Sequence, residues 1–297
     1  MATQALRPTG GFLHGYSHSL NPYIGCRFGC SYCYVAALPV ALRGAGRPWG
    51  DWVQAKPDLP AQLERDLAQL QQRGELESVR VFFGSATDPY QPLERKLEIT
   101  RRCLAALARR PPGRLVLQTR APLVERDLGL LRRIPRALVS LTIETDDESV
   151  RRTITPRCPP LEARWSAAHA LRRAGIELQI SAAPLLPHHP DRFAARLAES
   201  ADRVVVDTLL DGDGAGGRRS AALPIAGQLG ARGLDWRDPR PARALLERLR
   251  ALMGADRVGF SCEGFNRVVL PPSAAGARAP KSASIPPNRR SQPCATS

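Results

Sequence analysis

Lysine is nearly absent from this chain of 297 residues, although the chain is strongly basic. Lysine and arginine total 43, aspartate and glutamate total 28, and the formal net charge is +15. Only Lys56, Lys96 and Lys281 are lysines, so arginine supplies the other 40 positive charges. Clustered cations attract phosphate, which makes nucleic acid a candidate partner. A GC-rich coding sequence also produces an excess of arginine and alanine, so charge alone does not decide the matter.

Long hydrophobic runs are also lacking. No stretch reaches the roughly 18 to 20 apolar residues that a membrane-spanning helix requires. The first 15 residues have no apolar run after a basic start, so they do not resemble a secretion signal. We therefore expect a cytoplasmic protein with no membrane association. The 43% of hydrophobic residues is enough for a sizeable core in one large domain or two small ones.

The chain also lacks the even number of cysteines that a full set of disulfides would need. Seven cysteines in a chain without a secretion signal argue against a disulfide framework. Four of the seven are scattered, at Cys103, Cys158, Cys262 and Cys294. The other three, Cys26, Cys30 and Cys33, fall within eight residues.

Short apolar runs alternate with longer amphipathic segments from about residue 17 to residue 210. The predicted strands cover residues 20–24, 79–83, 115–119, 138–143, 176–180 and 204–206. The predicted helices between them cover residues 59–72, 93–109, 123–133, 160–174 and 191–200. Such alternation requires parallel strands with right-handed crossovers. Six units are too few for a closed eight-fold barrel, so we expect an α/β fold with a partial (β/α)6 barrel.

The rest of the chain divides into a leader at 1–15, a short C-terminal extension at 211–270 and a tail at 271–297. Residues 211–217 are rich in aspartate and glycine but lack the ligand spacing of a calcium or phosphate loop, and we interpret them as a flexible connector or lid. A helix over 241–252 and an apolar segment over 257–262 complete the extension. The basic tail holds six prolines, five serines and no acidic residue, so we expect it to be disordered.

The three clustered cysteines have the spacing C-x3-C-x2-C directly after the first predicted strand. Gly25 and Gly29 allow a tight turn, and three thiolates on so short a loop can bind one soft metal centre. No fourth cysteine follows at ferredoxin spacing, so a cubane cluster would keep one iron open to an organic ligand. Zinc is the alternative metal, because His14 or His18 would complete a tetrahedral Cys3His site.

The cysteine loop, with Tyr32 before its third cysteine, resembles that of the radical S-adenosylmethionine (SAM) superfamily. Residues 21–34, 84–94 and 118–127 are similar to the branch that includes spore photoproduct lyase and the so-called DNA repair photolyases. The resemblance covers roughly residues 16–210, which we take as the catalytic core. It implies an enzyme in which a [4Fe–4S] cluster cleaves SAM reductively to a 5′-deoxyadenosyl radical that abstracts a substrate hydrogen.

The resemblance also implies particular site residues. Cys26, Cys30 and Cys33 would bind the cluster. The other expected cofactor-binding residues lie at or near the carboxyl ends of strands, where ligands gather in parallel βα folds. They are Tyr32 and Tyr34 near the adenine and the cluster, Ser85, Thr87 and Asp88 near the methionine amino group, Arg120 ending strand three, and Thr142 with Glu144 toward the ribose or the SAM carboxylate.

The partners follow from the same resemblance. A reductant of the flavodoxin or ferredoxin type would supply one electron, whereas the motifs leave the substrate and the oligomeric state open. Nucleic acid is favoured modestly over a peptide or protein side chain. A zinc-stabilised nucleic-acid-binding protein without catalysis is the alternative from a different class.

One segment departs from the family pattern. Spore photoproduct lyase returns a hydrogen atom from a cysteine near the end of its second strand, but this chain has no thiol between Phe83 and Asp88. This departure argues against thymine-dimer reversal unless another residue donates. Cys158, after the fourth predicted strand, is the other cysteine that we expect near the barrel mouth.

Overall fold

A mainly parallel sheet organises the molecule. The computed structural model describes residues 4–268, and the predicted tail at 271–297 lies outside the described residues. The eight strands, in spatial order, are β1 (Arg7–Pro8), β2 (His18–Leu20), β5 (Arg80–Phe83), β6 (Arg114–Thr119), β7 (Ala137–Thr142), β8 (Glu177–Ala182), β9 (Arg203–Val206) and β10 (Val258–Phe260). β1 is antiparallel to β2, and the other neighbours are parallel. The predicted α/β class and partial barrel are confirmed.

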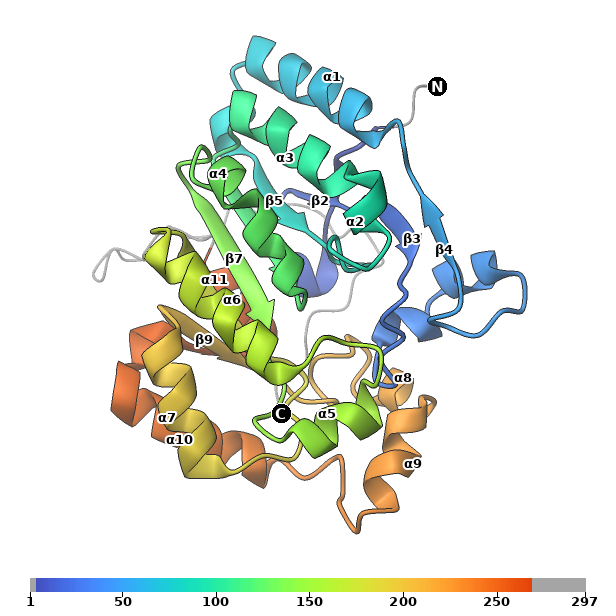
Figure 1. The fold of residues 1–297 in the computed structure, drawn as a ribbon, viewed down its shortest axis with the longest axis vertical. Helices are drawn as coiled ribbons and strands as arrows, with labels where there is room; N and C mark the ends of the chain where they lie inside the picture. Colours follow the sequence, from blue (N-terminus) through green and yellow to red (C-terminus); the bar gives the residue numbers. More distant parts are fainter. Residues whose placement is uncertain (1–3, 269–297) are drawn as a thin grey trace, which may run out of the picture.

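Helices connect the parallel strands and lie along the outer face of the sheet (Figure 1). The α-helices are α1 (Leu59–Gln72), α2 (Glu94–Leu97), α3 (Ile99–Arg109), α4 (Leu128–Leu131), α5 (Glu148–Ile154), α6 (Leu161–Arg173), α7 (Pro190–Ser200), α8 (Arg218–Ala221), α9 (Pro224–Gly230), α10 (Arg240–Met253) and α11 (Ser261–Arg267). The 3₁₀ helices are η1 (Gly11–Leu13), η2 (Tyr34–Ala37), η3 (Pro39–Gly44), η4 (Leu76–Ser78), η5 (Pro122–Asp127) and η6 (Ala255–Arg257).

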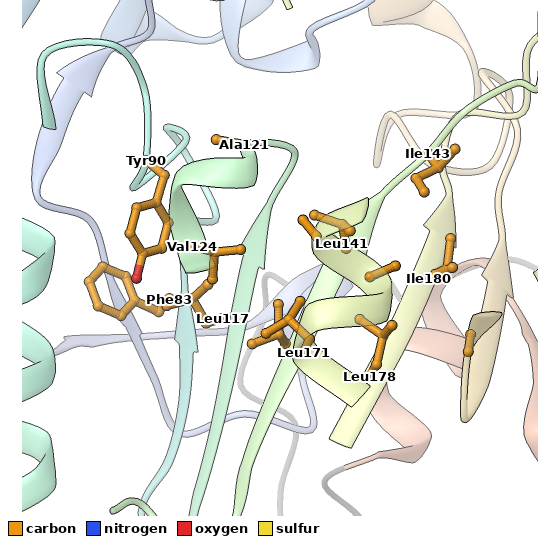
Figure 2. Close-up of a cluster of buried hydrophobic side chains, with 14 of the residues drawn as sticks. Phe83, Tyr90, Leu117, Ala121, Val124, Leu141, Ile143, Leu171, Leu178 and Ile180 are labelled. Atoms are coloured by element: carbon orange, nitrogen blue, oxygen red, sulfur yellow. The ribbon is translucent and has the colours of Figure 1, made fainter. Parts of the chain in front are cut away.

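The alternation of side chains along each strand builds two separate cores. Leu117 of β6 and Leu141 of β7 face outward and pack with Leu171 of α6 in the larger core (Figure 2). The neighbouring Val116 faces inward and belongs to a smaller core. Full burial of such a leucine or valine contributes roughly 1.5 to 3 kcal/mol. The strands are therefore anchored on both faces, as their continuous apolar runs predict.

The inner core joins the two ends of the described chain. Its buried members are Tyr16, Phe82, Val116, Leu138, Val205 and Phe265. The Tyr16 hydroxyl donates to the Phe265 carbonyl at 2.8 Å, and the Gly15 N–H donates to the Asn266 side-chain oxygen at 2.7 Å. The segment before β2 and helix α11 thereby close the inner side of the open barrel.

The prediction of a single first strand over residues 20–24 is wrong. The chain instead forms β2, which pairs with β5, and then β3 (Tyr23–Gly25), which pairs with β4 (Val53–Ala55) in a separate two-stranded sheet. Pro22 has no N–H and so cannot continue the hydrogen-bond ladder of the main sheet. This break directs the cysteine loop away from the sheet and over its carboxyl edge.

Two predicted helices are interrupted. The helix over 93–109 is divided into α2 and α3 at Glu98, whose φ of 50° is left-handed. The buried Glu94 carboxylate accepts hydrogen bonds from the N–H groups of Thr100 and Arg101 and so caps α3. The segment over 123–133 forms η5 and the short α4. Tertiary contacts outweigh helix propensity at both places.

The C-terminal extension completes the sheet. Its apolar segment forms β10, which pairs in parallel with β9 and adds a strand beyond the six predicted units. The predicted helix over 241–252 is α10. The predicted connector at 211–217 forms turns that lead into α8. The boundaries drawn at residues 15, 210 and 270 remain predictions.

Candidate active site

A cavity of about 450 Å³ opens where the parallel strands end. Its walls come from the cysteine loop, from the residues that follow β5 to β9, and from η1 and α11. Ten of the eleven site residues predicted from the sequence line it, namely Cys26, Cys30, Tyr32, Cys33, Tyr34, Ser85, Thr87, Asp88, Arg120 and Thr142. Glu144 is 1% exposed and lies outside the lining. The structure thus brings ten of the predicted residues to one cavity, and the role of each remains a proposal.

The cysteine loop is fixed by a close backbone approach. Gly25 has a φ of 81°, and a Cβ atom there would lie 2.7 Å from the Trp52 carbonyl, so only glycine fits. Burial raises the pKa of Cys26 to about 12, and the charge on Asp88 adds to this rise. The backbone N–H groups of Asp88 and Phe28 donate to the Cys26 sulfur and oppose the shift. The sulfur therefore sits among donors that stabilise a thiolate.

The Cys33 sulfur has similar surroundings. Burial raises the pKa of the Cys33 thiol, and the backbone N–H groups of Val35 and Ala36 lower it. The nearby indole N–H of Trp49, which has no hydrogen-bond partner of its own among the described residues, also lowers this pKa. Trp49 was not singled out from the sequence, because its place beside Cys33 depends on the turn that precedes β4.

The loop after β5 is tied to the cysteine loop by side chains. Asn21 donates to the Ser85 hydroxyl at 3.0 Å and accepts from the Ala86 N–H at 2.9 Å. The Tyr34 hydroxyl donates to the Ser85 carbonyl at 2.6 Å, and the Thr87 hydroxyl donates to the Gly25 carbonyl at 2.6 Å. The Thr87 side chain therefore supports the cysteine loop, and the other bonds hold residues 85–86 at the cavity wall.

Asp88 is a buried carboxylate that organises the ends of β5 and β6. One oxygen accepts from the Thr119 hydroxyl at 2.7 Å and from the Tyr90 N–H at 2.8 Å, and the other accepts from the Arg120 N–H at 2.9 Å. Burial raises the pKa of Asp88, while the nearby Arg120 charge opposes the rise. Asp88 therefore supplies a fixed acidic group to this wall.

A charged network lies beside Asp88. Glu144 accepts hydrogen bonds from the Tyr32 hydroxyl and from Arg120, and its second oxygen pairs with Arg164 at 2.6 Å. Burial alone would raise the pKa of Glu144, but the charges on Arg164 and Arg120 hold the pKa below its ordinary value. The Arg120 guanidinium also lies 5.6 Å from the Tyr32 ring centroid. Glu144 therefore positions Arg120 and Tyr32, which face the cavity.

Asp207, directly after β9, lines the opposite side of the cavity and was missed by the sequence analysis. It is 3% exposed, and its carboxylate accepts from the Thr208 N–H at 2.8 Å. Burial raises the pKa of Asp207 to about 7, the Thr208 N–H and the Ser261 side chain oppose the rise, and Asp211 and Asp213 add to it. An acidic residue at the carboxyl end of a predicted strand was the signal that could have found it.

Asp213 is also a buried acid, but its carboxylate is hydrogen-bonded by several backbone N–H groups. Its carboxylate accepts from the N–H groups of Ala215, Gly217, Arg219 and Ser220 at 2.7 to 3.0 Å. These bonds shape the 211–217 turn, which lines the cavity through Gly212, Asp213 and Gly214. The predicted connector is thus part of the cavity wall.

The remaining predicted ligands lie elsewhere. His14 is near Cys262, with 3.7 Å between its Nδ1 and the sulfur, and His18 bonds to Ser17 at 2.9 Å. Across residues 4–268, no three His, Cys, Asp or Glu side chains are close enough to share one metal ion. The Cys3His zinc site is therefore not assembled. Cys158, which is 4% exposed, lies with its sulfur 3.6 Å from the Cys30 sulfur.

Comparison with known sequences decides the family. Residues 20–201, more than half of the chain, match the sequence profile of the Radical SAM superfamily. The chain belongs to the radical SAM superfamily. An uncharacterized protein of Methanocaldococcus jannaschii is 29% identical over 186 residues, which are 63% of this chain and 66% of that protein. One from Mycobacterium tuberculosis is 27% identical over 180 residues, covering 59% and 52%. The chain thus spans about half to two thirds of these relatives.

Solved structures agree on the fold. Spore photoproduct lyase complexed with dinucleoside spore photoproduct gives a TM-score of 0.59 at 15% identity, over 88% of this chain and 79% of that chain. A variant of that enzyme gives 0.60 at 13% identity, over 88% and 80%. At these identities the similarity shows the radical SAM fold and not the substrate.

The residues present fit the [4Fe–4S] cluster that radical SAM proteins typically bind. Cys26, Cys30 and Cys33 line one cavity, and N–H groups donate to two of their sulfurs. Cubane thiolates bind separate irons, so they stand apart and need not surround one ion. A radical SAM fold indicates an enzyme. In the part of the chain that the structure describes, no helix has the length and apolar character to cross a membrane.

Proposed function

We propose that the chain is a radical SAM enzyme whose cavity holds a [4Fe–4S] cluster on Cys26, Cys30 and Cys33. When bound, the cluster supplies the electron that cleaves SAM to methionine and a 5′-deoxyadenosyl radical, which abstracts a substrate hydrogen. The observation that carries the proposal is the convergence of three buried or half-buried thiols on one cavity that seven of the other predicted site residues also line.

The wall from β5 to β7 would bind SAM. Asp88 is an acidic group held by three hydrogen bonds, so it suits the ammonium of the methionine moiety. Arg120 is cationic and faces the cavity, so it suits the SAM carboxylate. Tyr32 and Tyr34 offer ring surfaces to the adenine, and Ser85, Thr87 and Thr142 shape the pocket between these groups. Glu144 would act through Arg120, as its burial indicates.

The wall from β9 to α8 would face the substrate. Asp207 follows β9, which β6 to β8 separate from β5 in the sheet order. A nucleic-acid substrate is favoured by the net charge of +15 and by the resemblance to the lyase branch. A peptide or protein side chain is the alternative substrate. An electron donor of the flavodoxin or ferredoxin type would reduce the cluster in either case.

The experiment is anaerobic purification of the full chain followed by iron, sulfide and product analysis. We expect about four iron and four sulfide per chain, a brown colour, and conversion of SAM to 5′-deoxyadenosine after reduction with dithionite. Cys103→Ala is the matched control, because Cys103 is fully buried in α3 and does not line the cavity. A colourless protein that contains zinc would contradict the proposal.

A further inference from the structure

Two of the cysteines in the loop have a polar side chain from another segment nearby, Cys158 for Cys30 and Trp49 for Cys33. We propose that the Cys158 thiol and the Trp49 indole donate hydrogen bonds to the sulfurs of Cys30 and Cys33 and thereby raise the reduction potential of the cluster. This inference rests on the proposed function, since it concerns a cluster bound by those cysteines. Cys158 and Trp49 act through the ligands and are positioning residues.

The Cys158 sulfur lies 3.6 Å from the Cys30 sulfur, within reach of an S–H···S hydrogen bond. Once Cys30 binds iron as a thiolate it has no hydrogen to give, so the donor is Cys158. The backbone of Cys158 is fixed, because its carbonyl accepts from Arg151 at 2.8 Å and its N–H donates to Thr155 at 3.0 Å. Cys158 is outside the cavity lining, which leaves the open iron to SAM.

The Trp49 indole N–H is buried and has no hydrogen-bond partner among the described residues. A buried N–H without an acceptor costs about 1 to 3 kcal/mol, so its direction needs an explanation. The Cys33 sulfur, whose pKa the indole lowers, is the acceptor that we infer once the cluster is bound. The ring is held edge-on against Trp52, with 5.8 Å between centroids and 86° between planes. Trp49 lines the same cavity as Cys33.

Arg157 joins the two donor segments. Its guanidinium donates to the Gly50 carbonyl at 2.7 Å and pairs with Asp51 at 2.7 Å. Arg157 precedes Cys158, and Gly50 follows Trp49, so one side chain ties both donors together. Gly29 of the cysteine loop packs against Gly50, where a Cβ atom on Gly29 would lie 3.0 Å from the Gly50 Cα. Both donors are thus built into one unit with the loop.

Hydrogen bonds to cluster sulfurs help to set the reduction potential. A donor withdraws electron density from the thiolate and stabilises the reduced cluster, which carries the extra negative charge. Loss of a donor should therefore make the potential more negative. The effect would change the driving force for reduction without removing any iron ligand.

The test is an EPR-monitored redox titration of the anaerobically reconstituted full chain. Trp49→Phe keeps the ring and removes the N–H, and Cys158→Ala removes the S–H. At the wild-type midpoint we expect at least a tenfold lower ratio of reduced to oxidised cluster in each variant, which is about 59 mV for one electron. Cys158→Ser keeps a donor and should restore most of the wild-type ratio.

Two matched controls separate this effect from general loosening of the fold. Trp165→Phe removes another buried indole N–H, on α6, and Cys103→Ala removes another buried thiol. Both should keep the wild-type potential. An unchanged potential in Trp49→Phe and Cys158→Ala, with four irons still bound, would overturn the inference and leave the proposed function intact. A wild-type chain that binds no cluster would overturn both.

Discussion

The two walls of the cavity differ in whether their buried carboxylates have cationic partners. On the wall from β5 to β7, the Glu144 carboxylate is shared by Arg120 and Arg164, and Asp88 faces Arg120. On the wall from β9 to α8, Asp207 has no ion pair with any residue from 4 to 268, and the charges that act most on it, Asp211 and Asp213, are acidic. The carboxylates of the first wall therefore have cationic neighbours, whereas Asp207 on the second wall has no ion pair among residues 4–268.

This difference separates two tasks. A network whose charges are already paired is rigid and presents fixed groups, which suits a cofactor that is always the same molecule. A buried carboxyl group without a cation is energetically unfavourable unless it is neutral or meets a ligand. This property supports our proposal that the β9 wall faces the substrate.

Replacement of a cysteine in the loop should have the largest effect. Cys30→Ala would leave the cluster with two protein thiolates. The cluster would then be bound less firmly, and its reduction potential would change. We expect iron content to fall and 5′-deoxyadenosine formation to drop to the level of heat-inactivated protein. The measurement is product formation from SAM under dithionite, with Cys103→Ala as the control. Full activity in Cys30→Ala would falsify the ligand assignment.

Removal of the central carboxylate should disrupt the charge-balanced wall. Glu144→Gln leaves Arg164, which is 0% exposed, without its ionic partner. Breaking such a buried pair costs about 3 to 5 kcal/mol of unfolding free energy. Urea unfolding measures this loss. Glu162→Gln breaks the exposed pair with Arg196 and should cost less than about 1 kcal/mol; equal losses in the two variants would refute the contrast.

Asp207 should make stability depend on pH. Its folded pKa of about 7 is above the unfolded value of about 3.9, so the folded chain binds more protons between these values. Its contribution to stability is therefore fully present below about pH 4 and is lost as pH rises to about 7. Asn does not titrate, so the stability of Asp207→Asn lacks this pH dependence. The unfolding free energy of the variant minus that of the wild type should therefore be about 2 to 3 kcal/mol larger at pH 8 than at pH 5.

The same denaturation series on Asp191→Asn provides the control for this prediction, because the Asp191 side chain is 88% exposed. Its difference from the wild type should stay constant over the same range of pH. A constant difference for Asp207→Asn as well would show that the β9 wall carries no uncompensated charge.

The salt dependence of nucleic-acid binding should be the smallest and least specific effect. If the basic surface contacts phosphates, the affinity for a duplex of random sequence falls steeply between 50 and 200 mM salt. Fluorescence anisotropy of a labelled duplex measures this fall. A flat response would remove the charge argument and favour a peptide or protein substrate.

The sequence was sufficient for the class of fold, and it named residues that share one wall of the cavity. Periodicity and spacing predicted the parallel strands and the cysteine loop, because those patterns are local. Trp49 and Cys158 were harder to place, since their contacts with the loop join segments 16 to 128 positions apart. Asp207 escaped notice because its burial depends on the later β10 and α11 segments. The split of the first strand at Pro22 shows one local proline overriding an apolar run.

The central claim is that three cysteines hold a cube whose fourth iron stays open for SAM. EPR spectroscopy of the reduced, oxygen-free protein before and after addition of SAM tests it most directly. We predict a [4Fe–4S]⁺ signal whose g values change when SAM is added, since SAM binds the cluster itself. A signal that SAM leaves unchanged, or a protein with no cluster signal, would contradict the account.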